Sequence, residues 1–413
     1  MNILITGAQL SNKGAESMLY ITTDEMMKRF PNSTVYFATT KSFDESKYKF
    51  KKLNCSLASV YISLDVKKNF FKIIKAISKD IIKFLIGRSV ELNRYLDLKK
   101  TIEDIDMILD VSGFNLGKQW SKSAHELYLS RIKLAKKYNI PMFLMPQSFG
   151  PFDYDADMDG IKEEMAELLR YPQIIFAREK SGYDELIDTF TLNNVRLSND
   201  LVLQNDGIDL KNIFNKEPVI DIPKITKNED CNNKIVGIVP NAQCFNHGDK
   251  SHNLEIYRAI ITQLLKEDSD IVLFRHSKED ITICKMIKEM FRDETRVNIE
   301  EKEFSCIEYD KYVKQFSFII CSRFHGIVHA YRNGIPCIAL GWAIKYASLT
   351  ECVNQAEYSF DITAGKSNIK EIVEAVKNME TEYKNNRDII KRNVKRIQQE
   401  NCFDAIEEWV NNK

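Results

Sequence analysis

The chain has 413 residues, of which 44% are hydrophobic and 29% charged, and its formal net charge is zero. This length exceeds one typical hydrophobic core and favours two α/β domains of about 200 residues each. A net charge of zero provides no global field that would attract nucleic acid, so any anionic ligand must be held by local residues.

The cysteines and the N-terminus indicate the compartment. The nine cysteines are scattered and none forms a Cys-x-x-Cys pair, which favours reduced thiols in a cytoplasmic protein. Residues 1–17 contain a short apolar core without a basic region, which predicts a first strand rather than a signal peptide. No apolar run reaches the roughly 18 residues that span a bilayer.

Short apolar runs alternate with longer helical patterns along the whole chain. The first series of expected strands comprises residues 3–6, 35–38, 107–111, 142–145 and 174–177. The second series comprises residues 235–239, 271–274, 318–321 and 337–340. Helical patterns between them include residues 15–29, 123–137, 280–292 and 344–352. This alternation predicts parallel sheets built from strand–helix–strand units.

The composition divides this pattern into two halves. We expect an N-terminal Rossmann-like domain over 1–205, a linker over 206–234, a C-terminal Rossmann-like domain over 235–380 and terminal helices over 381–413. The linker contains two prolines and the polar sequence KNEDCNNK. Two facing domains of this kind leave a cleft at the carboxyl ends of both sheets, where ligands bind.

Polar residues follow three strands of the first domain. They are Asn12 and Gly14 after the first strand, Asp110, Ser112 and Asn115 after the third, and Gln147 and Ser148 after the fourth. Because parallel strands end at one edge of a sheet, we expect these residues to line the cleft. Asp110 could act there as a base, or it could close a turn, as Asp commonly does.

Arg178 stands at the end of the expected strand 174–177. A planar guanidinium at this position suits a carboxylate or a phosphate. The alternative is a surface arginine that pairs with Glu179 or Asp184.

The segment after the strand 318–321 combines several features of an anion site. Arg323 and His325 lie where this strand ends and a helix begins, and Ser322 is the expected N-cap of that helix. A guanidinium, an imidazole and a helix N-terminus together suit a small, multiply charged anion with proton transfer nearby. Lys345 follows the next strand and would add a second positive charge.

His325 and His329 are four residues apart, as in the HExxH helices that bind zinc. However, Gly326 follows His325, the catalytic glutamate is missing and no third ligand is apparent. We therefore expect no metal at this helix.

Residues 67–88 form a separate basic amphipathic pattern. Lys68, Lys72, Lys75, Lys79 and Lys83 share one face of the expected helix. Such a helix either packs on the domain with solvated lysines or docks on anionic lipid at the inner membrane face.

Four of these segments resemble the polysaccharide pyruvyl transferase family. They are NKGAE at 12–16, SGFNLG at 112–117, AREKSGYDEL at 177–186 and SRFHGIVHAYRNGIPCIAL at 322–340. The resemblance runs in order from residue 3 to about residue 350. The chain departs from the pattern of many relatives at Gly14-Ala15, where they carry Gly-Asp, and at 112–114, where they carry three glycines.

The resemblance implies a GT-B-like fold and phosphoenolpyruvate as donor substrate, with no further cofactor. The acceptor would be a sugar of a cell-surface polysaccharide or a lipid-linked oligosaccharide, and the product a pyruvyl ketal. The match places Arg178, Arg323 and His325 in the donor site.

We expect the two arginines to clamp phosphoenolpyruvate, His325 to act as a proton-donating imidazolium and Asp110 to act as base. One alternative is a GT-B glycosyltransferase that uses a nucleotide sugar in the same cleft. Another is a non-catalytic protein that binds glycans or nucleotides.

Overall fold

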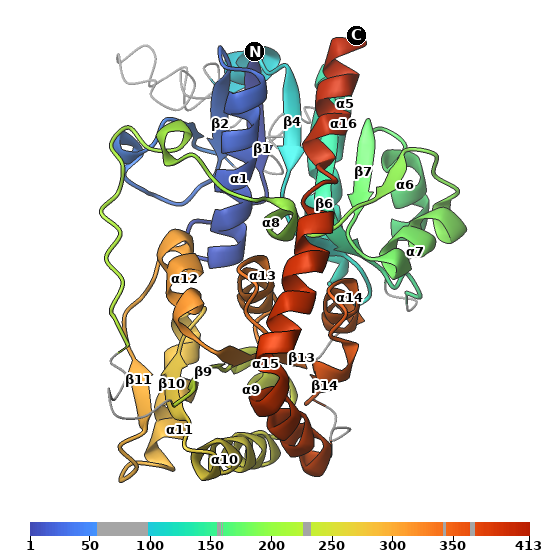
Figure 1. Ribbon diagram of the computed structural model, residues 1–413. Coiled ribbons are helices and arrows are strands. Elements are labelled where there is room, and N and C mark those ends of the chain that lie inside the picture. The colour runs from blue at the N-terminus through green and yellow to red at the C-terminus, as the bar shows by residue number, and fades with distance from the viewer. Residues whose placement is uncertain (56–97, 155–157, 159, 226–232, 342–343, 364–367) are drawn as a thin grey trace, which may run out of the picture.

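The structure is a computed structural model that describes residues 1–55, 98–154, 158, 160–225, 233–341, 344–363 and 368–413. Its two halves each contain a parallel sheet flanked by helices (Figure 1). The basic helix expected over 67–88 lies outside the described residues. Among the helices that are described, none combines the length and apolar character needed to cross a membrane.

The N-terminal sheet has the strand order β3-β2-β1-β4-β6-β7-β8, and β5 pairs with β6. Its strands are β1 (Asn2–Thr6), β2 (Thr34–Ala38), β3 (Lys51–Leu53), β4 (Met107–Asp110), β5 (Phe114–Leu116), β6 (Met142–Phe149), β7 (Ile174–Ala177) and β8 (Val195–Leu197). Neighbouring side chains of one strand enter opposite cores, with Ile3 and Ile5 on one face and Leu4 on the other. Apolar residues therefore occur in unbroken runs, as expected for a sheet covered on both faces.

The C-terminal sheet has the order β11-β10-β9-β12-β13-β14. Its strands are β9 (Ile235–Val239), β10 (Asp270–Phe274), β11 (Val297–Glu300), β12 (Phe318–Cys321), β13 (Cys337–Gly341) and β14 (Ser359–Asp361). All their pairings are parallel. The expected pair of parallel α/β domains is thus confirmed.

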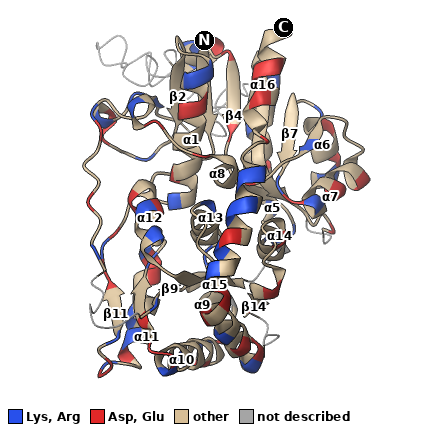
Figure 2. Ribbon diagram, viewed as in Figure 1, with Lys and Arg blue, Asp and Glu red and all other residues tan. Residues whose placement is uncertain are grey.

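Helices connect and cover these strands. In the N-terminal half they are α1 (Lys13–Arg29), α5 (Lys122–Tyr138), α6 (Ile161–Leu168), α7 (Lys180–Phe190) and α8 (Leu201–Gln204). In the C-terminal half they are α9 (Ala242–His247), α10 (Lys250–Lys266), α11 (Ile281–Glu289), α12 (Cys306–Tyr312), α13 (Phe324–Arg332) and α14 (Ile344–Cys352). Charges of both signs are interspersed over the outer helices (Figure 2), in keeping with the net charge of zero.

Helix α1 reaches from the N-terminal sheet to the C-terminal half (Figure 1). Asn12 caps it by accepting the backbone N–H of Ala15 at 3.2 Å. Its first turns contact α12 and α13, and the buried Lys13 donates to the backbone carbonyl of His276. The start of α1 is therefore part of the junction between the halves.

The chain ends with two helices, α15 (Ile369–Ile397) and α16 (Cys402–Asn411). The expected start of the terminal helices at residue 381 is wrong. Helix α15 begins directly after its N-cap Asn368 and runs through residue 381 without a break. Helix α16 packs on the N-terminal half, where the ring centres of Trp409 and Phe143 are 5.3 Å apart.

The expected linker also has structure at its beginning. The backbone N–H of Asp209 donates to Asp24 of α1 at 3.1 Å, and the side-chain amide of Asn212 donates to the same carboxylate at 2.8 Å. The first residues after α8 thus pack on the N-terminal half, because two polar groups fasten them to α1.

Replacing Ile406 of α16 by alanine should destabilise the N-terminal half by about 2–5 kcal/mol, because a fully buried side chain is lost. Hydrogen exchange should then rise in α1 and β6 and stay unchanged in β10. The matched variant Ile372→Ala alters the preceding helix α15, in the core of the C-terminal sheet, and should give the reverse pattern. Faster exchange in β10 for Ile406→Ala would contradict the assignment of α16 to the N-terminal half.

Candidate active site

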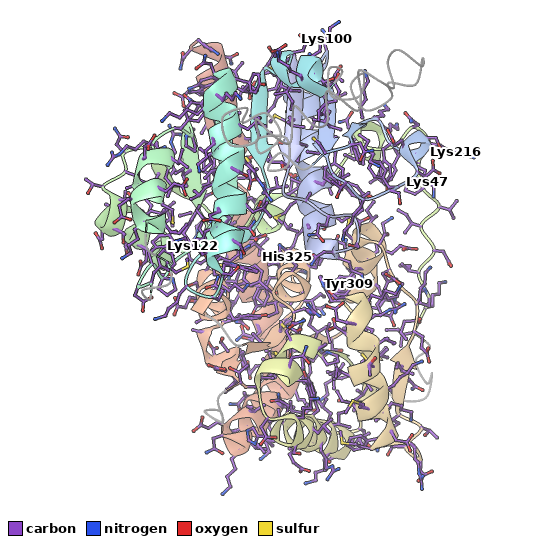
Figure 3. All side chains as sticks on the ribbon, turned by 180° about the vertical axis from the view of Figure 1, so that it is seen from behind. Lys47, Lys100, Lys122, Lys216, Tyr309 and His325 are labelled. Atoms are coloured by element: carbon purple, nitrogen blue, oxygen red, sulfur yellow. The ribbon has the colours of Figure 1, made fainter. Side chains whose placement is uncertain are left out.

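The candidate site lies where the carboxyl ends of β6 and β7 meet the start of α13. Figure 3 shows His325 at the level of the junction between the two halves. Side chains from both halves contact one another here, as the following distances show.

Arg178 follows β7 and is buried in a polar cage. Its Nε donates to Ser148 Oγ at 3.0 Å and to Glu179 Oε1 at 2.9 Å, and one Nη donates to Asp200 at 3.0 Å. Its guanidinium carbon lies 4.3 Å from the centre of the Phe324 ring, which belongs to the other half. The expected position at a strand end is confirmed, but the arginine is buried and not on the surface.

His325 lies in the first turn of α13 and faces the same carboxylate. Its Nε2 is 3.9 Å from Asp200 Oδ2 and has no hydrogen-bond partner among the described residues. Burial lowers the pKa of His325 to about 3, against the attraction of Asp200, and the nearby charges of Arg178 and Lys345 add to the lowering. The imidazole is therefore neutral near pH 7 in the ligand-free protein, contrary to the expected imidazolium.

Gly14 is required by the approach of α1 to this imidazole. A Cβ atom at position 14 would lie 2.2 Å from Cγ and Nδ1 of His325. The sequence prediction placed Gly14 in contact with a ligand. The structure gives it a different task, because its missing side chain makes room for His325.

Lys345 lies near the start of α14 and reaches toward the same site. Its Nζ is 5.1 Å from the ring centre of Phe114 and 5.4 Å from that of Phe324. Burial lowers the pKa of Lys345 to about 7, and the charge of Arg178 contributes, while Glu179 opposes the shift.

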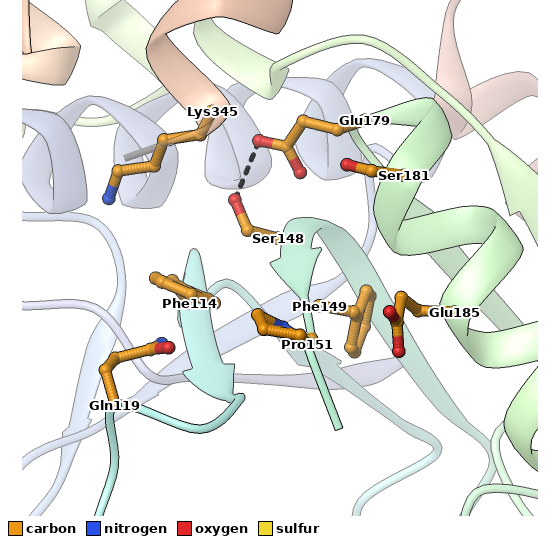
Figure 4. Close-up of a pocket in the computed structure, with 10 residues that line it drawn as sticks. Phe114, Gln119, Ser148, Phe149, Pro151, Glu179, Ser181, Glu185 and Lys345 are labelled. Carbon is orange, nitrogen blue, oxygen red and sulfur yellow. Dashed lines mark hydrogen bonds between the residues drawn. The ribbon is translucent and has the colours of Figure 1, made fainter. Parts of the chain in front are cut away.

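A cavity of about 240 Å³ opens beside these residues (Figure 4). It is lined by Phe114, Gln119, Ser148, Phe149, Gly150, Pro151, Glu179, Ser181, Glu185 and Lys345. A smaller cavity of about 20 Å³ lies between Arg178, Asp200 and Phe324, and it shares Glu179 and Lys345 with the larger one. Lys345 therefore borders both spaces.

Three expected cleft residues lie elsewhere. Asp110 is fully buried and pairs with Arg131 of α5 at 2.8 Å, and the same guanidinium donates to Ser112 Oγ at 2.6 Å. Gln147 is hydrogen-bonded to the hydroxyl of Tyr128, also on α5, at 3.1 Å. These side chains turn toward α5, which covers the sheet, and not toward the cleft. Asp110 is therefore not placed to act as the expected base.

Arg323 and Ser322 are held within the C-terminal half. The guanidinium of Arg323 binds the buried Asp280 through two nitrogens, at 2.9 and 2.5 Å, and also binds Glu279 at 2.6 Å. Ser322 does not cap α13, because Arg323 occupies the N-cap position and the Ser322 hydroxyl bonds Tyr257 at 2.8 Å. Neither residue lines the two cavities described above.

Of the remaining expected residues, one lies in the site and two lie outside it. Ser148 lies in the site, where its hydroxyl donates to Glu179 at 2.7 Å. Asn12 serves as the cap of α1, and Asn115 lies on β5 beside Phe114.

The sequence interpretation missed Asp200, Glu179 and Phe114. Asp200 follows β8 and caps α8 through the backbone N–H of Val202 at 2.9 Å. Its place after a strand is a signal in the sequence, but it is a weak one because aspartate is common at helix N-caps. Nothing in the local sequence distinguishes Phe114 from an ordinary core residue.

A second polar cluster joins the halves beside a cavity of about 290 Å³. His329 is buried and bonds Asp310 through Nδ1 at 2.9 Å and Ser17 of α1 through Nε2 at 3.1 Å. Arg332 of α13 donates to the carbonyl of Asn205 at 2.8 Å. His329 therefore connects the two halves through hydrogen bonds. Within the described ranges, no group of three or more potential metal ligands occurs.

The contact between Gly14 and His325 can be tested by a double-mutant cycle. Gly14→Ala alone should destabilise the protein by about 1–3 kcal/mol, because the added methyl group forces the imidazole aside. In a His325→Ala background the same change should be neutral or stabilising by up to about 1 kcal/mol, because alanine favours the helix. Equal effects in both backgrounds, measured by denaturant unfolding, would show that the two residues do not touch.

Solved structures with a similar fold support this architecture. A glycosyltransferase from Rickettsia africae superposes with a TM-score of 0.55 at 10% identity, covering 100% of this chain and 99% of that one. A UDP-GlcNAc 2-epimerase from Neisseria meningitidis, bound to UDP-GlcNAc, gives a TM-score of 0.52 at 14% identity, with 94% of each chain covered. The protein therefore has the GT-B fold that these enzymes share.

Among curated proteins no match was found. The family model described as polysaccharide pyruvyl transferase matches residues 12–343, which include both halves and all the site residues up to His325. The chain is thus a transferase that belongs to the polysaccharide pyruvyl transferase family.

Proposed function

We propose that the protein transfers the pyruvyl group of phosphoenolpyruvate to two hydroxyls of a sugar and releases phosphate. The acceptor belongs to a cell-surface polysaccharide or its lipid-linked precursor. The observation that carries the proposal is the junction at which Arg178 and Lys345 line a small cavity, with His325 Nε2 3.9 Å from Asp200, which lines the same cavity. These side chains suit a small anion and proton transfer to it.

The donor is proposed to bind between Arg178 and the start of α13. Helix α13 has no side-chain cap at its N-terminus, so its first backbone N–H groups and its dipole favour an anion there. Arg178 donates to Ser148, Glu179 and Asp200 through Nε and one Nη, and the other Nη nitrogen is proposed to hold the donor. Arg323 stays in the proposal as the residue that anchors the start of α13 to Asp280.

His325 is proposed to gain a proton when the donor binds. A phosphate dianion beside the imidazole favours its charged form and raises its pKa. The imidazolium then donates its proton to C3 of phosphoenolpyruvate, which makes C2 electrophilic. A sugar hydroxyl bonds to C2 and loses its proton to a base, which passes it to solvent. The bond between C2 and the phosphate oxygen breaks, and the second hydroxyl closes the ketal as its proton leaves with the phosphate.

The place of action is proposed to be the cytoplasmic side of the inner membrane. The basis is the basic sequence pattern of 67–88 and a lipid-linked acceptor. Five lysines on one face would supply electrostatic attraction to anionic lipid of about 1 kcal/mol each.

Phosphoenolpyruvate should raise the melting temperature of the protein, whereas UDP should not. At about 100 times its dissociation constant, a ligand adds about 2.7 kcal/mol of stability. Arg178→Lys should weaken phosphoenolpyruvate binding at least about tenfold, because an ammonium cannot replace the planar guanidinium. Arg258→Lys, an exposed change on α10, should bind normally. Stabilisation by UDP alone would instead favour a nucleotide-sugar glycosyltransferase.

Binding of phosphoenolpyruvate should be accompanied by proton uptake. The free protein holds the pKa of His325 at about 3, and the bound anion raises it. Affinity should therefore fall as the pH rises through the pKa of the complex. Calorimetry at one pH in buffers of different ionisation enthalpy measures the uptake. His325→Gln should bind the donor within about tenfold, equivalent to 1.4 kcal/mol, but should lose this part of the uptake. Equal uptake by both proteins would exclude His325 as the proton carrier.

A further inference from the structure

The cavity of about 240 Å³ beside Lys345, here called the larger cavity, adjoins the proposed donor site, and neither Arg178 nor His325 lines it. It lies at the carboxyl end of β6, between β5, the start of α7 and Lys345 of the opposite half (Figure 4). The two cavities share Glu179 and Lys345. A ligand in the larger cavity would therefore meet a donor held by Arg178 at these two side chains.

We propose that the larger cavity binds one sugar residue of the acceptor, and that Lys345 accepts the proton of the hydroxyl that attacks the donor. This inference rests on the pyruvyl transfer proposed above. It names the acceptor subsite and the base.

The lining of the cavity suits a sugar ring. Phe114, Phe149 and Pro151 provide apolar walls for the C–H groups of a pyranose. Gln119 and Glu185 provide an amide and a carboxylate that can bond hydroxyls, and few convergent polar groups in an apolar cavity are typical of small-ligand sites. The volume of about 240 Å³ lies below the roughly 300–1,000 Å³ of sites for larger ligands. The cavity therefore fits a single sugar residue better than a nucleotide sugar.

Lys345 is the better placed of the two side chains that border both cavities. Glu179 already accepts hydrogen bonds from Ser148 at 2.7 Å and from Arg178 at 2.9 Å, so its carboxylate is occupied. The Nζ of Lys345 lies near the faces of Phe114 and Phe324, which attract an ammonium and so allow the amine to take up a proton. In the ligand-free protein, burial lowers the pKa of Lys345 to about 7, so its amine loses a proton more readily than that of an exposed lysine, as a general base requires.

The proposed step conserves protons and electrons. The attacking sugar hydroxyl loses its proton to Nζ of Lys345, and its oxygen forms a bond to C2 of the donor. The π electrons between C2 and C3 take the proton that His325 supplies. Phosphate leaves with the electron pair of its bond to C2, the second sugar hydroxyl bonds to C2 and gives its proton to the phosphate, and Lys345 then releases its proton to solvent.

The test compares two variants. Lys345→Arg keeps the positive charge but cannot act as a base, and Lys345→Met loses both the charge and the basic amine. Phosphate release is measured with phosphoenolpyruvate and a panel of p-nitrophenyl glycosides of galactose, glucose, mannose and N-acetylmannosamine. Both variants should lower kcat at least about 100-fold, and Lys345→Arg should bind phosphoenolpyruvate with wild-type affinity. In both variants kcat/KM for the sugar should lose the rise with pH that marks deprotonation of Lys345 in the donor complex. Lys180→Met, which removes an exposed lysine of α7 outside the cavity, should retain wild-type turnover.

The acceptor cavity is tested separately by Phe114→Ala. It should raise the KM for the sugar at least about tenfold, a loss of 1.4 kcal/mol, while the dissociation constant of phosphoenolpyruvate stays unchanged. An unchanged sugar KM would remove the cavity from the acceptor site.

The outcomes separate this inference from the proposed function. Wild-type protein that binds no phosphoenolpyruvate overturns the pyruvyl transfer and this inference with it. Wild-type protein that binds phosphoenolpyruvate but releases no phosphate with any sugar of the panel overturns the cavity as a site for a single sugar residue and leaves the pyruvyl transfer standing. Wild-type turnover together with normal kcat in Lys345→Arg overturns only the role of Lys345 as base. If Lys345→Met loses donor binding and kcat while Lys345→Arg retains both, Lys345 only supplies a positive charge that binds the donor. This result would also overturn its role as base.

Discussion

The absence of a side chain at position 14 is the constraint on which the junction of the two halves depends. A methyl group there would overlap the imidazole of His325, so the start of α1 could not approach the start of α13. Two helix N-termini from different halves meet at this point, and both direct their positive dipole ends toward it. Lys13, at the start of α1, is buried at the same junction. A chain of zero net charge thus acquires a local positive potential.

The carboxylate of Asp200 balances this potential in the ligand-free protein. It bonds the guanidinium of Arg178 and lies 3.9 Å from the imidazole of His325. Removing one partner of a buried ion pair costs about 3–5 kcal/mol, because the remaining charge stays uncompensated. Asp200 therefore compensates the charge of Arg178 and holds its guanidinium in place, while burial keeps the nearby imidazole neutral in the ligand-free protein. Under the proposed function, this arrangement would link donor binding to protonation of His325, and the proton would be available mainly when the donor is present.

The sequence predicts the two sheets well because their strands are buried on both faces. Runs such as residues 107–109 and 318–321 are apolar throughout, and their side chains enter separate cores on either side. The strand-end positions of Arg178 and His325 follow directly from these runs. The expected start of the terminal helices at residue 381 is wrong because it rests on a change in composition, which does not end a helix. Helix α15 continues without any glycine or proline from Ile369 to Ile397.

The direction of a polar side chain at a strand end is harder to predict. Asp110 and Arg178 both follow apolar strands, but Asp110 meets Arg131 on the covering helix α5, whereas Arg178 meets Asp200 at the junction. Arg323 is similar, because its partner Asp280 lies 43 positions earlier in the chain. In each case the deciding partner comes from a distant segment. The residue types alone suggest an anion site, and only the fold distinguishes a ligand contact from an internal ion pair.

The junction also explains why the orientation of the halves matters for the proposed chemistry. Arg178 and Ser148 come from one half, and His325 and Lys345 from the other, so neither half contains a complete site. Buried hydrogen bonds fix their relation, including that between His329 and Ser17. Each such bond contributes only about 1 kcal/mol net, but an unsatisfied buried partner costs about 1–3 kcal/mol. Other relative positions of the halves would leave several of these groups unpaired, and the polar contacts therefore select the one arrangement in which the donor residues and Lys345 face each other.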